Sequence, residues 1–135
     1  MNKNRVKYLI VGGFAFSYYA HPRFTKDIDV FVEMSQANAE NIVNTLIDFG
    51  FRGSTIKKEF FLQPQKIIQL GFPPMRIDII TSISGIEFGE AWDNRVLGEY
   101  GDVPCFFISK NDLMKNKKAA GRPQDIADLK MLRKQ

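Results

Sequence analysis

The pattern of hydrophobic and polar positions begins with an apolar run at residues 6–11, which predicts a buried strand. Gly12 and Gly13 follow directly, and they end the run as a tight turn would. A short helix is predicted over residues 14–20, because Pro22 disfavours helical backbone in the residue before it. A strand, a glycine turn and a short helix therefore form the first predicted unit.

Two later stretches alternate between apolar and polar residues, as strands with one buried face do. Within residues 26–33, Asp27 and Asp29 fall on one face, with Cα atoms about 6.5 Å apart. Residues 75–81 alternate in the same way, and the side of that strand that carries its charges holds Arg76, Asp78 and Ile80. The pattern thus places carboxylates on two strands that are otherwise largely apolar.

The remaining pattern predicts helices that alternate with further strands. Strands are expected at residues 59–63, 66–70, 95–100 and 103–108, a short helix at 90–93, and longer helices at 35–48, at 109–120 and from Pro123 onwards. The apolar stripes of two of these helices include Ile47 and Ile126. This order predicts an α+β (α/β-like) fold, with a mixed β-sheet flanked by helices, in one domain over residues 1–135.

Composition supports a packed domain and restricts the function classes. The chain has 135 residues, of which 44% are hydrophobic and twelve are Phe, so we expect a core rather than disorder. One Cys and one His exclude an internal disulfide and a zinc cluster built from those residue types. No apolar run is long enough to span a bilayer, and no signal peptide is recognisable, so the cytoplasm is the expected location.

The paired carboxylates are the strongest chemical signal in the sequence. Asp27 and Asp29 would repel one another unless a positive charge lies between them, and a divalent cation would answer that need. Asp78 would complete a site for two metal ions if its strand lies beside the first. The structural alternative is a solvated strand end, and short motifs such as Asp-x-Asp often have no function.

The ordered set of motifs resembles the DNA polymerase beta-like nucleotidyltransferase superfamily. The set is Val11-Gly12-Gly13-Phe14-Ala15, then Asp27-Ile28-Asp29, then Met75-Arg76-Ile77-Asp78-Ile79-Ile80, then residues 116–129. The last segment is similar to the basic and acidic ending of small bacterial members, which are related to the abortive-infection toxin nucleotidyltransferases. The resemblance spans residues 6–132 and implies a nucleotidyltransferase fold.

The resemblance implies a role for each matching residue. Gly12 and Gly13 would hold a nucleoside triphosphate through backbone N–H groups. Asp27 and Asp29 would bind both metal ions, two Mg²⁺ or Mn²⁺. Asp78 would bind the catalytic ion and help to activate the attacking hydroxyl. Position 13 departs from the Gly-Ser form of the motif, so it offers no hydroxyl to a phosphate oxygen.

Basic residues would complete the nucleotide site. Lys117 would contact the phosphates, with Asp125 orienting it, and Arg23 and Lys26 are further candidates for phosphate contact. The structural alternative is that Lys115, Lys117 and Lys118 form a solvated helix face.

The implied reaction moves a nucleoside monophosphate from the triphosphate to an acceptor hydroxyl and releases pyrophosphate. The acceptor could be tRNA, a protein or a small molecule, and the chain could be a toxin–antitoxin component with an antitoxin or a second copy as partner. A catalytically silent nucleotide-binding or partner-binding module of the same fold is the main alternative. A basic nucleic-acid-binding domain is a third, although the net charge of +4 is dispersed along the chain.

Overall fold

The sheet is mixed, and two of its neighbouring strands carry the carboxylates. The computed structural model describes residues 4–20, 22, 27–48, 50, 57–72 and 75–134. Six strands pair in the order β3-β4-β2-β1-β6-β5. They are β1 (Tyr8–Val11), β2 (Asp27–Val32), β3 (Ile67–Phe72), β4 (Met75–Ile80), β5 (Val96–Tyr100) and β6 (Val103–Phe107).

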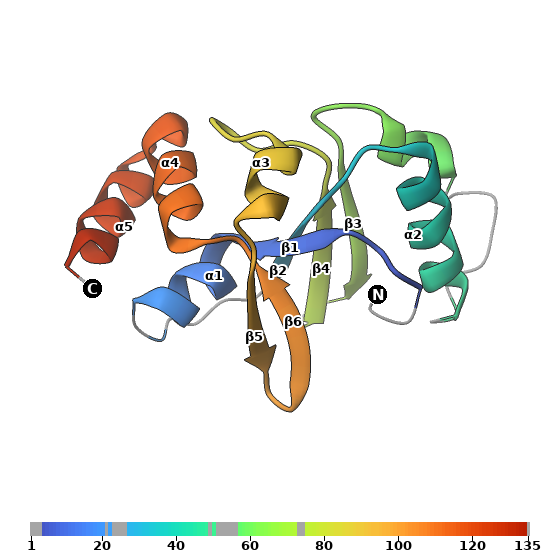
Figure 1. The fold of residues 1–135 in the computed structure, drawn as a ribbon, viewed down its shortest axis with the longest axis horizontal. Coiled ribbons are helices and arrows are strands. Elements are labelled where there is room, and N and C mark those ends of the chain that lie inside the picture. Colours follow the sequence, from blue (N-terminus) through green and yellow to red (C-terminus); the bar gives the residue numbers. More distant parts are fainter. Residues whose placement is uncertain are drawn as a thin grey trace.

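Helices flank this sheet, as the sequence predicts (Figure 1). They are α1 (Gly12–Tyr19), α2 (Gln36–Asp48), α3 (Phe88–Asp93), α4 (Lys110–Ala120) and α5 (Pro123–Arg133), with a 3₁₀ turn, η1 (Lys58–Leu62). β2 runs antiparallel to β1 and parallel to β4, while β6 runs parallel to β1. The α+β prediction is therefore confirmed. No helix among the described residues is long and apolar enough to cross a membrane.

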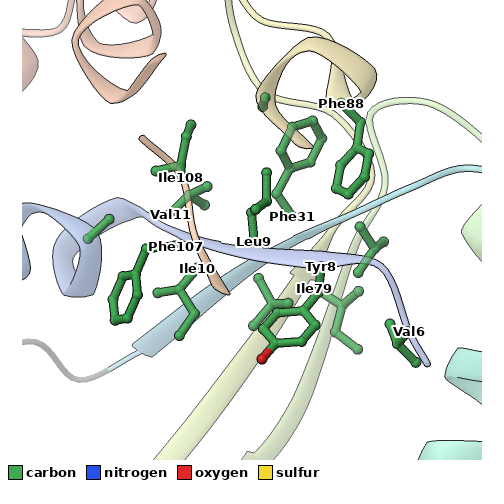
Figure 2. Close-up of a cluster of buried hydrophobic side chains, with 14 of the residues drawn as sticks. Val6, Tyr8, Leu9, Ile10, Val11, Phe31, Ile79, Phe88, Phe107 and Ile108 are labelled. Carbon is green, nitrogen blue, oxygen red and sulfur yellow. The ribbon is translucent and has the colours of Figure 1, made fainter. Parts of the chain in front are cut away.

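The core lies on both faces of β1 (Figure 2). Leu9 is paired with Phe31 of β2, whose ring packs edge-on against Phe88 of α3 at 5.1 Å. Ile10 points to the opposite face, together with Phe107 of β6. These side chains are almost completely buried, so β1 is fixed from both sides and its end at Val11 is a rigid starting point for α1.

Helix α4 begins and ends at residues that suit helix capping. The Ser109 hydroxyl accepts a hydrogen bond from the Asp112 backbone N–H at 3.1 Å, and Gly121 closes α4 with φ +66°. Pro123 opens α5 at once. The sharp left-handed turn at Gly121 therefore brings α5 back against α4.

Three local predictions are wrong. Residues 59–63 form η1 rather than a strand, because Phe61 is fully buried as part of that short helical turn. Ile47 and Ile126 are 46% and 48% exposed, although both were assigned to apolar stripes. In α5 the buried face instead holds Asp125, Asp128, Leu129 and Leu132.

Candidate functional site

Three carboxylates lie on one face of two neighbouring strands. Asp29 is opposite Asp78 in the parallel β2–β4 pair, and Asp27 is opposite Arg76. Adjacent strands are about 4.8 Å apart, and directly paired residues point to the same side. Asp78 therefore lies beside the Asp-x-Asp pair, on the face that also holds Phe31 and the start of α1.

Gly12 lies against the carboxylate of Asp29. A Cβ atom at position 12 would collide with Asp29 Oδ2, and Gly12 has φ +67°, in the left-handed region. Glycine is therefore required here for both conformation and space. It begins α1, so Asp29 lies beside the helix N-terminus, where backbone N–H groups are free to bind an anion.

Arg76 pairs with two of the three carboxylates. Its Nη2 atom donates a hydrogen bond to Asp27 Oδ2 at 2.5 Å, and its Nε atom lies 3.2 Å from Asp78 Oδ1. The second contact is an ion pair without hydrogen-bond geometry, since neither Arg76 Nε nor Asp78 Oδ1 has a hydrogen-bond partner. The guanidinium thus supplies part of the positive charge that this face requires.

Lys117 is buried between two carboxylates where α4 meets α5. Its Nζ atom lies 3.4 Å from Asp125 Oδ1 and 2.9 Å from Asp128 Oδ2. All three side chains are nearly inaccessible, so the alternative of a solvated lysine face does not hold for Lys117. Because a lone buried charge is very unfavourable, the three groups hold one another in place.

Arg122 places an exposed cation beside the same cluster. Its Nε atom lies 2.6 Å from Asp125 Oδ2, while its side chain is 75% exposed. The bond to Asp125 raises the pKa of the guanidinium, with smaller contributions from Asp128 and Asp29. Arg122 is therefore within electrostatic range of the carboxylate face, and it is accessible to an anionic ligand.

Comparison with known families identifies the kind of protein that carries this arrangement. The profile of a family described as "Nucleotidyltransferase of unknown function (DUF6036)" matches residues 1–133, nearly the whole chain. The chain belongs to this nucleotidyltransferase family. No curated protein matches it. The match supports nucleotidyl transfer as the general activity, and the mixed sheet with flanking helices is consistent with the nucleotidyltransferase fold.

In this member of the nucleotidyltransferase family, the electrostatics of the carboxylate face centre on Asp29. Burial, then the neighbouring charges of Asp78 and Asp27, raise the pKa of Asp29 from 3.8 to about 6. Lys117 and Arg76 oppose that shift through their positive charges.

The residues of the carboxylate face fit a divalent cation. Asp78 Oδ1 is buried and accepts no hydrogen bond, and carboxylate oxygens are the protein ligands that Mg²⁺ prefers. Among the described residues, no group of three or more His, Cys, Asp or Glu side chains is arranged as a ready-made metal site. Arg76 already pairs with Asp27 and Asp78, so a cation there would have to share or replace those contacts.

The structure brings together some of the predicted site residues. The residues that lie next to one another are Gly12, Asp27, Asp29 and Asp78. Lys117 acts on Asp29 through its charge. Gly13 lies in the first turn of α1. Arg23 and Lys26 lie outside the described residues. The roles of all these residues in binding and catalysis stay predictions.

Sequence reasoning gave no site role to Arg76 and Arg122, which lie at or within electrostatic range of this face, or to Asp128, which pairs with the buried Lys117. The alternation of residues 75–81 already put Arg76 on the face of Asp78, and this was a usable signal. Asp125 and Asp128 are three residues apart, a spacing that puts two carboxylates on one helix face.

Proposed function

We propose that the chain is a metal-dependent nucleotidyltransferase that moves a nucleoside monophosphate from a nucleoside triphosphate, such as ATP, to an acceptor hydroxyl. One observation carries the proposal: the register that sets Asp29 beside Asp78, with Asp27 on the same face, at the start of α1. Carboxylates clustered at a helix N-terminus suit a triphosphate that arrives with Mg²⁺ or Mn²⁺, in a site for two ions.

The reaction would be an in-line substitution at the α-phosphorus. The acceptor oxygen forms a bond to the α-phosphorus as the bond to the bridging oxygen breaks, and pyrophosphate leaves with that electron pair. Asp78 would take the hydroxyl proton, directly or through a water molecule. Bound divalent ions would neutralise the phosphate charge that develops in the transition state.

Other groups of the chain would position the triphosphate. The first backbone N–H groups of α1, at Gly12 and Gly13, would hold the phosphates, because a helix N-terminus carries partial positive charge. The Arg122 side chain is exposed, and its guanidinium, which donates to Asp125 through Nε and Nη2, could also donate a charge-assisted hydrogen bond to a phosphate. Lys117, buried between Asp125 and Asp128, would add long-range positive charge rather than a direct contact.

The acceptor and the partners form the wider part of the proposal. The resemblance to abortive-infection toxin nucleotidyltransferases supports tRNA, a protein or a small molecule as the acceptor. It also supports a cytoplasmic toxin–antitoxin role, with an antitoxin or a second copy as partner. These assignments rest on the four sequence motifs.

A catalytically silent nucleotide-binding module is the second candidate, and Arg76 favours it. A guanidinium already compensates Asp27 and Asp78, so a face that never binds metal would be stable in this form. This candidate predicts triphosphate binding that survives Asp78→Asn, a stable complex with a partner protein, and no transfer.

Transfer of label from α-³²P-labelled triphosphates tests the proposal. The purified protein would be incubated with Mg²⁺ or Mn²⁺ and an acceptor panel of total tRNA, proteins and small hydroxyl compounds. Asp27→Asn and Asp29→Asn should each reduce labelling at least about a hundredfold. Asp102→Asn is the matched control, because Asp102 is exposed in the turn between β5 and β6. Equal labelling by wild type and Asp29→Asn would contradict the proposal.

A further inference from the structure

Arg76 is the one cation that contacts the carboxylate face directly in the described part of the chain. It bridges two strands, because its backbone lies on β4 opposite Asp27 of β2 and its side chain also reaches Asp78 on its own strand. The Asp78 side chain is 13% exposed and that of Asp27 is 27% exposed. A carboxylate pair so far removed from water needs a counter-charge.

The two contacts of Arg76 differ in quality. The bond to Asp27 has hydrogen-bond geometry, whereas the ion pair with Asp78 does not. A buried donor and a buried acceptor therefore face each other at 3.2 Å with their hydrogen bonds unmade, which is unfavourable. Arg76 balances charge here without satisfying Asp78, so a ligand that fits the oxygens of Asp78 better could replace it.

The Arg76 side chain can also move away from the two carboxylates. One third of it is exposed, and only its own dihedral angles need to change, since its backbone is fixed by pairing on both sides. A released guanidinium is always charged and seeks an anion. A triphosphate that enters with its metal ions would provide one beside the start of α1.

We propose that Arg76 is an internal counter-ion of the carboxylate face, which yields Asp78 and Asp27 to a divalent cation and then contacts the triphosphate. The inference rests on the proposed function and adds a positioning residue to it. Arg76 weakens the binding of metal alone, because the cation must displace it. It strengthens the binding of metal together with triphosphate, because the displaced guanidinium gains a partner. The two ligands therefore bind with positive coupling.

Titration with Mn²⁺, in the presence and absence of inorganic tripolyphosphate, tests this exchange. Calorimetry or electron paramagnetic resonance would compare wild type with Arg76→Gln, Arg76→Lys and Arg133→Gln. Arg133→Gln removes the same charge from an exposed position at the end of α5. Arg76→Gln should bind Mn²⁺ alone about tenfold more tightly than wild type and should lose most of the gain that tripolyphosphate gives. The Mn²⁺ affinity of Arg76→Lys should lie between those of wild type and Arg76→Gln, because a single ammonium cannot bridge both carboxylates as the guanidinium does.

Suppose that the protein binds Mn²⁺ with tripolyphosphate, but Arg76→Gln binds Mn²⁺ alone no more tightly than wild type does. That result would overturn the exchange and leave the proposed function standing. If wild type and variants bind neither ligand, the proposed function falls, and the exchange with it. The counter-ion role of Arg76 in the metal-free protein has its own test. A double-mutant cycle of Asp27→Asn and Arg76→Gln would be measured by unfolding in chelator. Additive effects would overturn the counter-ion role, and favourable coupling would support it.

Discussion

Asp78 lies directly opposite Asp29 across the parallel β2–β4 pair, although 48 residues of chain lie between them. Asp78→Asn keeps the side-chain shape and removes the charge. We predict that it reduces nucleotidyl transfer at least about a hundredfold, because the face would lose a proposed metal ligand and its candidate base. Labelled transfer measures this, with unchanged circular dichroism as the control for folding. Transfer within a few-fold of wild type would show that Asp78 has no part in the reaction.

The raised pKa of Asp29 makes stability depend on pH. The folded chain holds this proton more tightly than the unfolded chain, so the free energy of unfolding falls as the pH rises from 3.8 to about 6. Asp29→Asn should therefore be more stable than wild type at pH 7 without metal, by roughly 1 kcal/mol after allowing for solvent screening. The difference should vanish below the lower limit of that window. Denaturant unfolding in chelator at several pH values measures it, and a pH-independent difference would contradict the account.

Gly12 is predicted to tolerate no side chain. Gly12→Ala would strain a left-handed backbone and also push against the Asp29 carboxylate, so we expect destabilisation of about 2–3 kcal/mol. Gly101→Ala separates the two effects, because Gly101 has φ +61° but open space where a Cβ atom would lie. It should lose only about 1 kcal/mol. Thermal unfolding compares the two variants, and equal losses would show that contact with Asp29 adds nothing.

Lys117 and Arg122 should differ in how much they contribute to the free energy of unfolding. Lys117→Met would leave Asp125 and Asp128 buried without their shared cation, which should cost about 3–5 kcal/mol of stability. Arg122→Gln changes an exposed side chain, so its stability should change by less than about 1 kcal/mol.

Triphosphate affinity is the second measurement that distinguishes Arg122 from Lys117. Arg122→Gln should weaken binding about tenfold, because a charge-assisted bond to phosphate is lost. Equilibrium binding of a fluorescent triphosphate, measured alongside unfolding, checks both parts. A folded and binding-competent Lys117→Met protein would contradict the role given to the buried cluster.

The strands of the carboxylate face were predictable because their pattern is local. Alternation in residues 26–33 and 75–81 assigns the faces of β2 and β4, and it holds in the structure. The order of strands in the sheet depends on contacts between segments that are far apart in the sequence. That β4 pairs beside β2 follows from tertiary packing of Phe31, Ile79 and their neighbours, which no single stretch of sequence contains.

The errors in prediction also have physical causes. A run such as residues 59–63 suits either a strand or a helical turn, and burial of Phe61 decides in favour of the turn. In α5, Ile126 is exposed rather than buried, and the buried face includes Asp125 and Asp128 because Lys117 of α4 compensates their charge. An ion pair between separate helices leaves no periodic signal in the sequence.

The central claim is that Asp27, Asp29 and Asp78 bind the metal ions of a nucleoside triphosphate. Anomalous diffraction from crystals grown with Mn²⁺ and a non-hydrolysable triphosphate tests it most directly. The account predicts anomalous peaks beside these three carboxylates, with the triphosphate at the start of α1 and Arg76 turned from Asp78 towards a phosphate. Absence of any peak at the face, with Arg76 still paired to Asp27 and Asp78 beside a bound triphosphate, would contradict it.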